Sequence, residues 1–143
     1  MSLFSNLFKG KETKKEPSLD PEETLNIVAD KDPNPRIEYY FEIKDKLDGW
    51  TDNQKALLYR WIGKACDAGF ADKEYRDSQV CLAFFAASLA LDSRAERDPW
   101  IYFDIKYGFP ASQANADMLH KHYPLPETLE EARNYKVEII SNK

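Results

Sequence analysis

The sequence predicts an all-α protein, a single compact domain of about six helices around a buried central helix, Val80–Leu91. Three observations support this fold class. The stretch Val80–Leu91 is rich in Ala and Leu and has one polar side chain, Ser88, which favours a helix that is apolar on all sides and therefore buried. Helix-start signals such as Asp20-Pro21 recur along the chain. Apolar residues make up 43% of the 143 residues, enough material for one core.

The chain divides into an N-terminal segment, residues 1–19, and a helical domain, residues 20–143. Four apolar side chains in residues 1–9 have helical spacing, and lysines follow them: Leu3, Phe4, Leu7 and Phe8. We expect either a short terminal helix or a weak anchor for a membrane surface or a partner. Residues 10–19 are polar and typical of a flexible linker. The apolar stretches are too short to span a bilayer.

Prolines and a glycine bound the first two helices of the domain. A helix over residues 21–30 begins with Pro and is capped by Asp20. Two prolines in residues 31–35 predict a turn, because the residue before each Pro is pushed out of the α region. A second helix is predicted from Arg36 to about Leu47, with Gly49 as its candidate left-handed C-terminal residue.

The next two helices contain most of the predicted core. Thr51 and Gln54 fit a capping box at the start of a helix over residues 52–67. Gly69-Phe70 ends that helix, and Asp72 caps the helix that contains Val80–Leu91. Within the central helix we expect Ser88 to donate to the carbonyl group four residues earlier.

Three more helices complete the predicted bundle. Asp98-Pro99 begins a short aromatic helix that stops at Gly108, although the same residues have strand propensity. A helix over residues 111–122 turns one face inward: Ala111, Ala114, Met118, Leu119 and His122. The last helix runs from Pro126 to about Glu138.

A repeated pattern connects two parts of the chain. Trp61-Ile62 precedes Gly69-Phe70, and Trp100-Ile101 precedes Gly108-Phe109 at the same offset of 39 residues. Offsets of this size are typical of stacked helix–turn–helix units, so the domain can also be described as two such units.

The first of these units resembles the Sel1-like repeat, a relative of the tetratricopeptide repeat. The resemblance rests on Trp61, Lys64-Ala65, Gly69, Ala71 and Tyr75, and it extends over roughly residues 52–122. The Sel1-like repeat carries Lys-Ala-Ala after its Trp, and the second unit lacks this element. Pro99 also places Trp100 at the start of its helix. The resemblance implies an adaptor that binds other proteins on a helical surface, not an enzyme. It also implies bacterial relatives that include proteins which neutralise secreted toxins.

Charge and cysteine content narrow the functional classes. The formal net charge is −5, which argues against nonspecific binding to nucleic acid or anionic lipid and suits a basic protein partner. Cys66 and Cys81 both fall on apolar stretches and are expected to be buried thiols, with a disulfide or a catalytic cysteine as the alternative. No secretory signal is visible, so we expect a cytoplasmic protein.

No catalytic constellation stands out. His120 and His122 are two positions apart, which places their rings on different sides of a helix and excludes a shared metal; we expect His122 to face inward and His120 to face solvent. There is no phosphate-binding glycine loop and no zinc motif. We therefore expect no enzyme, no cofactor and no metal.

Acidic residues beside aromatic ones are the candidate partner-binding site. The site consists of Glu38, Tyr39, Glu42, Asp45, Asp48 and Asp52. Tyr40, Phe41 and Trp50 are interleaved with them. A simpler interpretation is a solvated helix face over core aromatics. As a docking site, the carboxylates would steer a basic partner and the aromatics would anchor it.

These observations favour a small acidic protein-binding module that sequesters or inhibits a protein partner. The most concrete version is an immunity-type protein that neutralises a toxin. A scaffold or chaperone-type adaptor of a bacterial assembly, with residues 1–9 as a docking helix, is the first alternative. An enzyme with an unrecognised site is the second.

Overall fold

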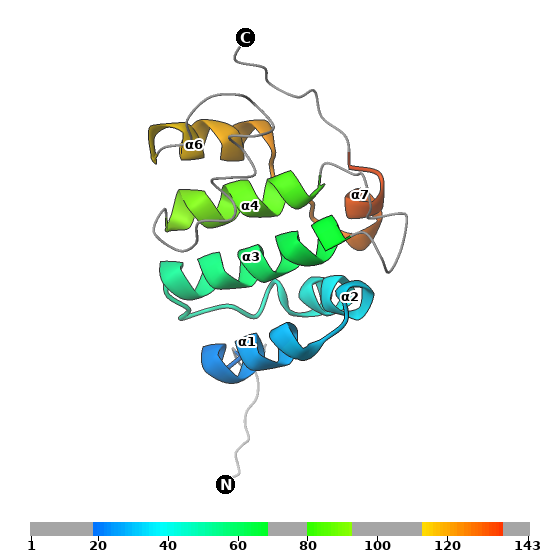
Figure 1. The fold of residues 1–143 in the computed structure, drawn as a ribbon. Helices are drawn as coiled ribbons and strands as arrows, with labels where there is room; N and C mark the ends of the chain where they lie inside the picture. Colours follow the sequence, from blue (N-terminus) through cyan, green and yellow to red (C-terminus); the bar gives the residue numbers. More distant parts are fainter. Residues whose placement is uncertain (1–18, 69–79, 93–112, 136–143) are drawn as a thin grey trace, which may run out of the picture.

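The computed structural model describes residues 19–68, 80–92 and 113–135. Within these ranges it contains six helices and no strand, which confirms the all-α class (Figure 1). Several predictions lie outside the described residues: the segment 1–9, the Gly69-Phe70 turn, the Asp72 cap, the helix from Asp98 to Gly108, and residues 111–112. The second unit of the predicted repeat therefore lies largely outside the described residues.

The first helix, α1 (Pro21–Asp30), has the predicted bounds. The Asp20 carboxylate accepts a hydrogen bond from the Glu23 backbone N–H at 2.8 Å. Pro21 fits the first turn because its missing N–H has no intrahelical partner there. Leu19, expected in the linker, is part of the fold: its N–H donates to the Lys46 carbonyl at 3.1 Å, and its carbonyl accepts from Trp50 Nε1 at 3.0 Å.

The predicted bounds of the second helix are wrong at both ends. Helix α2 spans Pro33–Ile43, so it begins three residues before Arg36 and ends four before Leu47. Both prolines of residues 31–35 lie in its first turn, where a backbone N–H is not needed. Gly49 does have a positive φ of 85°, but it belongs to a turn closed by Trp50 N–H to the Leu47 carbonyl at 3.1 Å, beyond the helix end.

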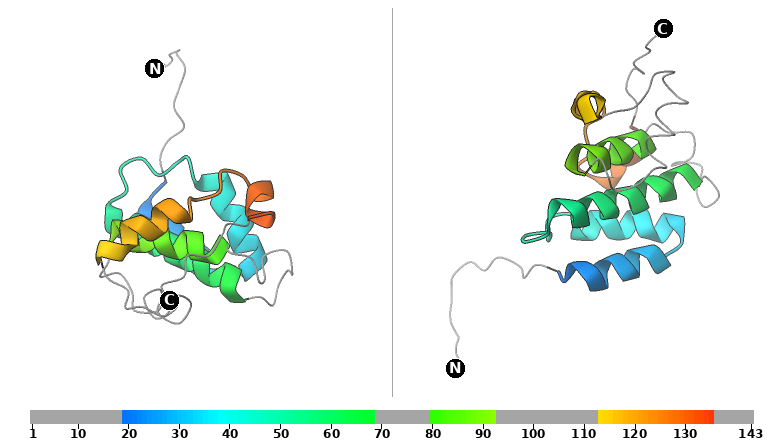
Figure 2. Two further views of the ribbon diagram at one scale, coloured as in Figure 1. Left: turned by 90° about the horizontal axis from the view of Figure 1, so that it is seen from above. Right: turned by 60° about the vertical axis from the view of Figure 1, so that its left-hand side comes forward.

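Helices α3 (Asp52–Ala68) and α4 (Val80–Leu91) form the centre of the fold. The predicted capping box is present: Thr51 N–H donates to Gln54 Oε1 at 2.9 Å, and Gln54 N–H donates to Thr51 Oγ1 at 3.1 Å. All side chains from Val80 to Leu89 are buried, which confirms the buried central helix. Figures 1 and 2 show α4 between α3 and α6, with α1 and α2 on the far side of α3.

The seam between α3 and α4 is antiparallel and closely packed. A Cβ atom on Gly63 would lie 2.5 Å from Cε1 of Phe85, so the Phe85 ring occupies the place of a side chain. Ser88 Oγ donates to the Ala56 carbonyl on α3 at 2.7 Å. The prediction that Ser88 bonds to its own helix is thus wrong, because a carbonyl of the neighbouring helix lies within reach.

Of the last two described helices, α6 ends at the predicted residue and α7 is shorter than predicted. Helix α6 spans Gln113–His122, and α7 spans only Leu129–Arg133 instead of Pro126 to about Glu138. Thr128 caps α7 by accepting from the Glu131 N–H at 3.1 Å, and this local cap sets the later start. On α6, Leu119 is buried as predicted, but Met118 is 39% exposed and does not face inward.

Arg36 ties the first three helices together. Its guanidinium donates to the carbonyls of Ala29 (3.2 Å), Lys31 (2.7 Å) and Trp61 (3.3 Å). The first two carbonyls lie at the C-terminal end of α1, where a cation is favoured by the helix dipole. The guanidinium carbon also lies 5.3 Å from the Trp61 ring centroid.

Candidate functional site

The structure exposes all five carboxylates of the predicted site. Glu38 and Glu42 lie on α2, and Asp45 and Asp48 lie in the connection that follows it. Asp52 is the first residue of α3. Their side chains face solvent, so they are available for long-range attraction of a basic molecule.

The aromatic residues beside them divide between the core and the surface. Tyr40 (3% exposed) and Trp50 (6% exposed) belong to the core and cannot contact a partner without unfolding. Tyr39 is partly buried, and Lys31 Nζ lies 5.0 Å from its ring centroid. Phe41 is also partly buried and packs against the core. Of the predicted aromatic anchors, only Tyr39 and Phe41 reach the surface.

A lysine links the predicted site to a part of the chain that sequence patterns did not connect with it. Lys44 Nζ lies 3.3 Å from Asp45 Oδ1 and 3.3 Å from Glu127 Oε1, just before α7. Burial lowers the pKa of Lys44, but its hydrogen bonds to Glu127 and Asp45 outweigh burial and raise it. No local pattern identifies Glu127, because it is 83 residues from Lys44.

A hollow of about 380 Å³ lies beside this ion pair. It is lined by Lys44, Asp45, Leu47, Asp48, Gly49, Lys55 and Tyr59. Asp45 and Asp48 are therefore brought together, but two lysines accompany them. Glu38, Glu42 and Asp52 do not line this hollow.

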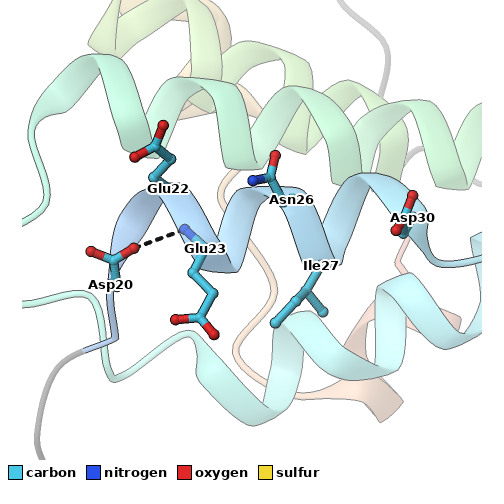
Figure 3. A pocket seen from close by; sticks show the side chains of 6 residues that line it. All are labelled: Asp20, Glu22, Glu23, Asn26, Ile27 and Asp30. Carbon is cyan, nitrogen blue, oxygen red and sulfur yellow. Dashed lines mark hydrogen bonds between the residues drawn. The ribbon is translucent and has the colours of Figure 1, made fainter.

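A second acidic surface, on α1, was not recognised from the sequence as a candidate site. A hollow of about 380 Å³ is lined by Asp20, Glu22, Glu23, Asn26, Ile27 and Asp30. Figure 3 shows Glu22 and Asn26 on one side of α1 and Glu23 and Ile27 on the other, with Asp20 at the helix start. Ile27 is 40% exposed. The spacing of Glu22, Asn26 and Asp30, four residues apart, is the pattern that could have revealed this polar face.

Residues 19–52, which supply most of the lining of both hollows, carry a surplus of negative charge. Residues 19–52 contain ten Asp and Glu and four Lys and Arg, a net charge of −6 in a chain whose total is −5. We call the exposed carboxylates of α1, α2 and the connection to α3 the acidic face. It consists of Asp20, Glu22, Glu23, Asp30, Asp32, Glu38, Glu42, Asp45, Asp48 and Asp52.

The other candidate chemical groups do not assemble into a site with the acidic face. His120 is partly buried, whereas the sequence predicts that it faces solvent. Its Nδ1 is buried and has no hydrogen-bond partner among the described residues. Burial lowers the pKa of His120, and Asp117 partly opposes this. The partly buried His122 packs its ring on Tyr123, with centroids 4.9 Å apart. In the described ranges no three His, Cys, Asp or Glu residues are placed to hold a metal ion.

Part of the segment with the Sel1-like resemblance lies on α3, whereas Gly69, Ala71 and Tyr75 lie outside the described residues. Ile62, Gly63, Ala65 and Cys66 are buried, whereas Lys64 is exposed. Trp61 is partly buried, and the guanidinium carbons of Arg36 and Arg60 lie 5.3 Å and 5.6 Å from its ring centroid.

Comparison of the chain with protein-family models, curated proteins and solved structures finds no match. The Sel1-like assignment therefore stays a prediction. None of the helices in the described part of the chain combines the length and apolarity needed to cross a membrane.

Proposed function

We propose that this chain is a small protein-binding module whose acidic face docks a basic protein partner and thereby occludes it. The observation that carries the proposal is the net charge of −6 in residues 19–52, presented by exposed carboxylates on a helical scaffold. A surface with a surplus of charge of one sign accelerates encounter with an oppositely charged protein by about ten- to a thousand-fold at low salt.

The rigidity of the scaffold supports this role. Arg36 fixes α1 to α2 and α3 through three carbonyls, and Leu19 and Trp50 hold the α2–α3 connection to the start of α1. The carboxylates are therefore held in fixed positions on helices and tight turns. A preformed charge pattern loses less entropy on binding than a flexible acidic tail does.

The most concrete form of the proposal is an immunity-type protein that neutralises a toxin. A toxin that acts on nucleic acid needs a basic cleft, and carboxylates held on helices can take the place of the phosphates that such a cleft binds. Direct inhibition follows if the acidic face fills the cleft. The cytoplasm is the compartment in which we propose that this takes place.

The test is affinity purification of the tagged full-length chain from its own cells, at low and high salt, with two triple variants. One variant reverses charge in the predicted site: Glu38→Lys, Glu42→Lys and Asp45→Lys. The matched control reverses the same number of exposed carboxylates elsewhere: Asp67→Lys, Asp117→Lys and Glu130→Lys. Both variants change the net charge equally. A difference between them therefore reports the position of the charges and not the overall charge.

A basic partner that the control retains and the first variant loses supports the proposed face. A partner retained by both variants contradicts this face as the docking site. Loss from both variants shows that only the net charge matters, which contradicts a specific module. Once a partner is known, inhibition of its activity at a one-to-one ratio separates an inhibitor from an adaptor, which leaves that activity intact.

A further inference from the structure

The seam between α3 and α4 brings the two cysteines of the chain to the same place. Three contacts set the antiparallel register of the seam: Asn53 Nδ2 to Asp92 Oδ2 at 2.6 Å, Ser88 Oγ to the Ala56 carbonyl at 2.7 Å, and Gly63 under the Phe85 ring. Along the seam, residue numbers increase on α3 while they decrease on α4. One helical turn beyond Gly63 and Phe85, the same progression reaches Cys66 and Cys81.

The helix periodicity of α4 places Cys81 on the face that meets α3. Cys81, Phe85, Ser88 and Asp92 follow the spacing i, i+4, i+7, i+11, which is a single helix face. On α3, Cys66 lies three residues after Gly63 and shares its face. Both cysteine side chains are buried, Cys66 at 2% and Cys81 at 4% exposure, and no disulfide joins them.

Two further features bear on how these thiols can react. Gly63 has no side chain, so the Phe85 ring packs directly on α3 one helical turn from the cysteines; a disulfide needs Cα atoms within about 7 Å. Burial raises the pKa of the Cys66 thiol well above its ordinary value, and the nearby Cys81 adds to this increase. The interaction between the two groups is consistent with the register of the seam.

We propose that Cys66 and Cys81 form a redox-sensitive pair that joins α3 to α4 through a reversible disulfide when the chain meets a peroxide. The thiolate of one cysteine attacks hydrogen peroxide, which gives a sulfenic acid and, after proton transfer, one water. The thiol of the second cysteine attacks that sulfur, forms the S–S bond and releases a second water. The two thiols lose two hydrogens and two electrons, and one peroxide is reduced to two waters.

The burial of the pair sets the rate of this reaction. Because the thiolate is the nucleophile and burial disfavours it, cross-linking is slow near neutral pH and accelerates as the pH rises. The bond closes a loop of 16 residues, from Cys66 to Cys81. A loop of that length raises the thermal midpoint by roughly 5 °C or more.

The test treats the folded full-length protein with hydrogen peroxide at two pH values and maps non-reduced proteolytic peptides by mass. Whole-protein mass alone is unsuitable, because the exposed Met118 also takes up oxygen. We expect a Cys66–Cys81 linked peptide that forms faster at the higher pH, a raised thermal midpoint, and reversal of both by dithiothreitol. Cys66→Ala and Cys81→Ala each abolish the midpoint shift.

Three results overturn the proposal: sulfinic or sulfonic acid at either cysteine without the linked peptide, disulfides between molecules only, or a linked peptide that forms only in urea. If a cysteine variant does not fold, the peptide map of the peroxide-treated wild-type chain alone decides between these outcomes.

Discussion

Gly63 of α3 lies directly under the ring of Phe85 of α4, where a Cβ atom would be 2.5 Å from Cε1 and 2.6 Å from Cδ1. No real side chain tolerates so short a contact. Phe85 is 3% exposed and belongs to the core, so a shift of its ring would disturb neighbouring core side chains. This pair therefore fixes how closely the two central helices pack.

Replacement of Gly63 by Ala is expected to destabilise the fold. Ala gains about 0.5–1 kcal/mol over Gly in a helix interior, but an added methyl group in a filled core costs about 1–3 kcal/mol or more. We expect a net loss in the free energy of unfolding, measured by urea titration. The double variant Gly63→Ala with Phe85→Leu is the control, because the smaller Leu side chain relieves the contact. The loss caused by Gly63→Ala should be smaller with Leu at position 85 than with Phe. An equal loss in the two cases would contradict this packing.

Ser88→Ala separates two hydrogen-bonding arrangements. If Ser88 donates to the Ala56 carbonyl across the seam, as at 2.7 Å in the structure, its loss costs about 1 kcal/mol of unfolding free energy. If Ser88 bonded within its own helix, Ala would be neutral or stabilising because of its higher helix propensity. Urea titration of the wild type and the variant distinguishes the two, and a neutral or positive change contradicts the bond between helices.

Arg36→Gln is expected to cost about 1.5–3 kcal/mol, because a charged donor to three carbonyls is lost. Desolvation by burial lowers the pKa of Arg36, and the charge of Asp32 partly opposes this, so the guanidinium is held by its hydrogen bonds in a partly buried position. Lys121→Gln is the matched control, since it removes one positive charge from an exposed site. Hydrogen exchange at the end of α1 should increase in the Arg36 variant alone. An equal effect in both variants would show that charge, and not the carbonyl contacts, is responsible.

His120 gives the fold a dependence on pH. Its folded-state pKa is lowered by burial from an ordinary value of about 6.5. The unfolded chain therefore takes up the proton first as the pH falls, and the free energy of unfolding decreases below pH 6.5 until the folded pKa is reached. Well above pH 6.5, His120 is neutral in both the folded and the unfolded state. Its contribution to the free energy of unfolding is then constant. His120→Asn should reduce this slope in urea titrations between pH 7 and pH 5, and an unchanged slope would refute the assignment.

Local chemistry accounts for what could be predicted from the sequence. The Asp20 cap and the Thr51–Gln54 box involve residues three positions apart, and both are present. The run Val80–Leu91 is apolar on all sides, which is sufficient to predict its burial. These features depend on neighbours in sequence and not on the tertiary fold.

The errors occur where a distant residue or a helix end decides the outcome. Ser88 bonds to a carbonyl 32 residues away, and Lys44 pairs with Glu127 across 83 residues. Pro33 and Pro35 predict a turn because proline is excluded from helix interiors, but that exclusion does not apply to the first turn of α2. The sequence does not single out the acidic surface of α1, because acidic residues such as Glu22 and Glu23 are common near the positive end of a helix dipole.

Electrostatic docking on the acidic face is tested most directly by the association rate constant with the purified partner, measured as a function of salt for wild type and the two triple charge-reversal variants. We predict that Glu38→Lys/Glu42→Lys/Asp45→Lys lowers the rate constant at least tenfold at low salt, and that high salt removes most of the difference from wild type. The control Asp67→Lys/Asp117→Lys/Glu130→Lys should stay within about threefold of wild type, because rate effects are local to the docking face. Equal rate constants for the two variants, or a salt-independent difference, would contradict electrostatic docking on the acidic face.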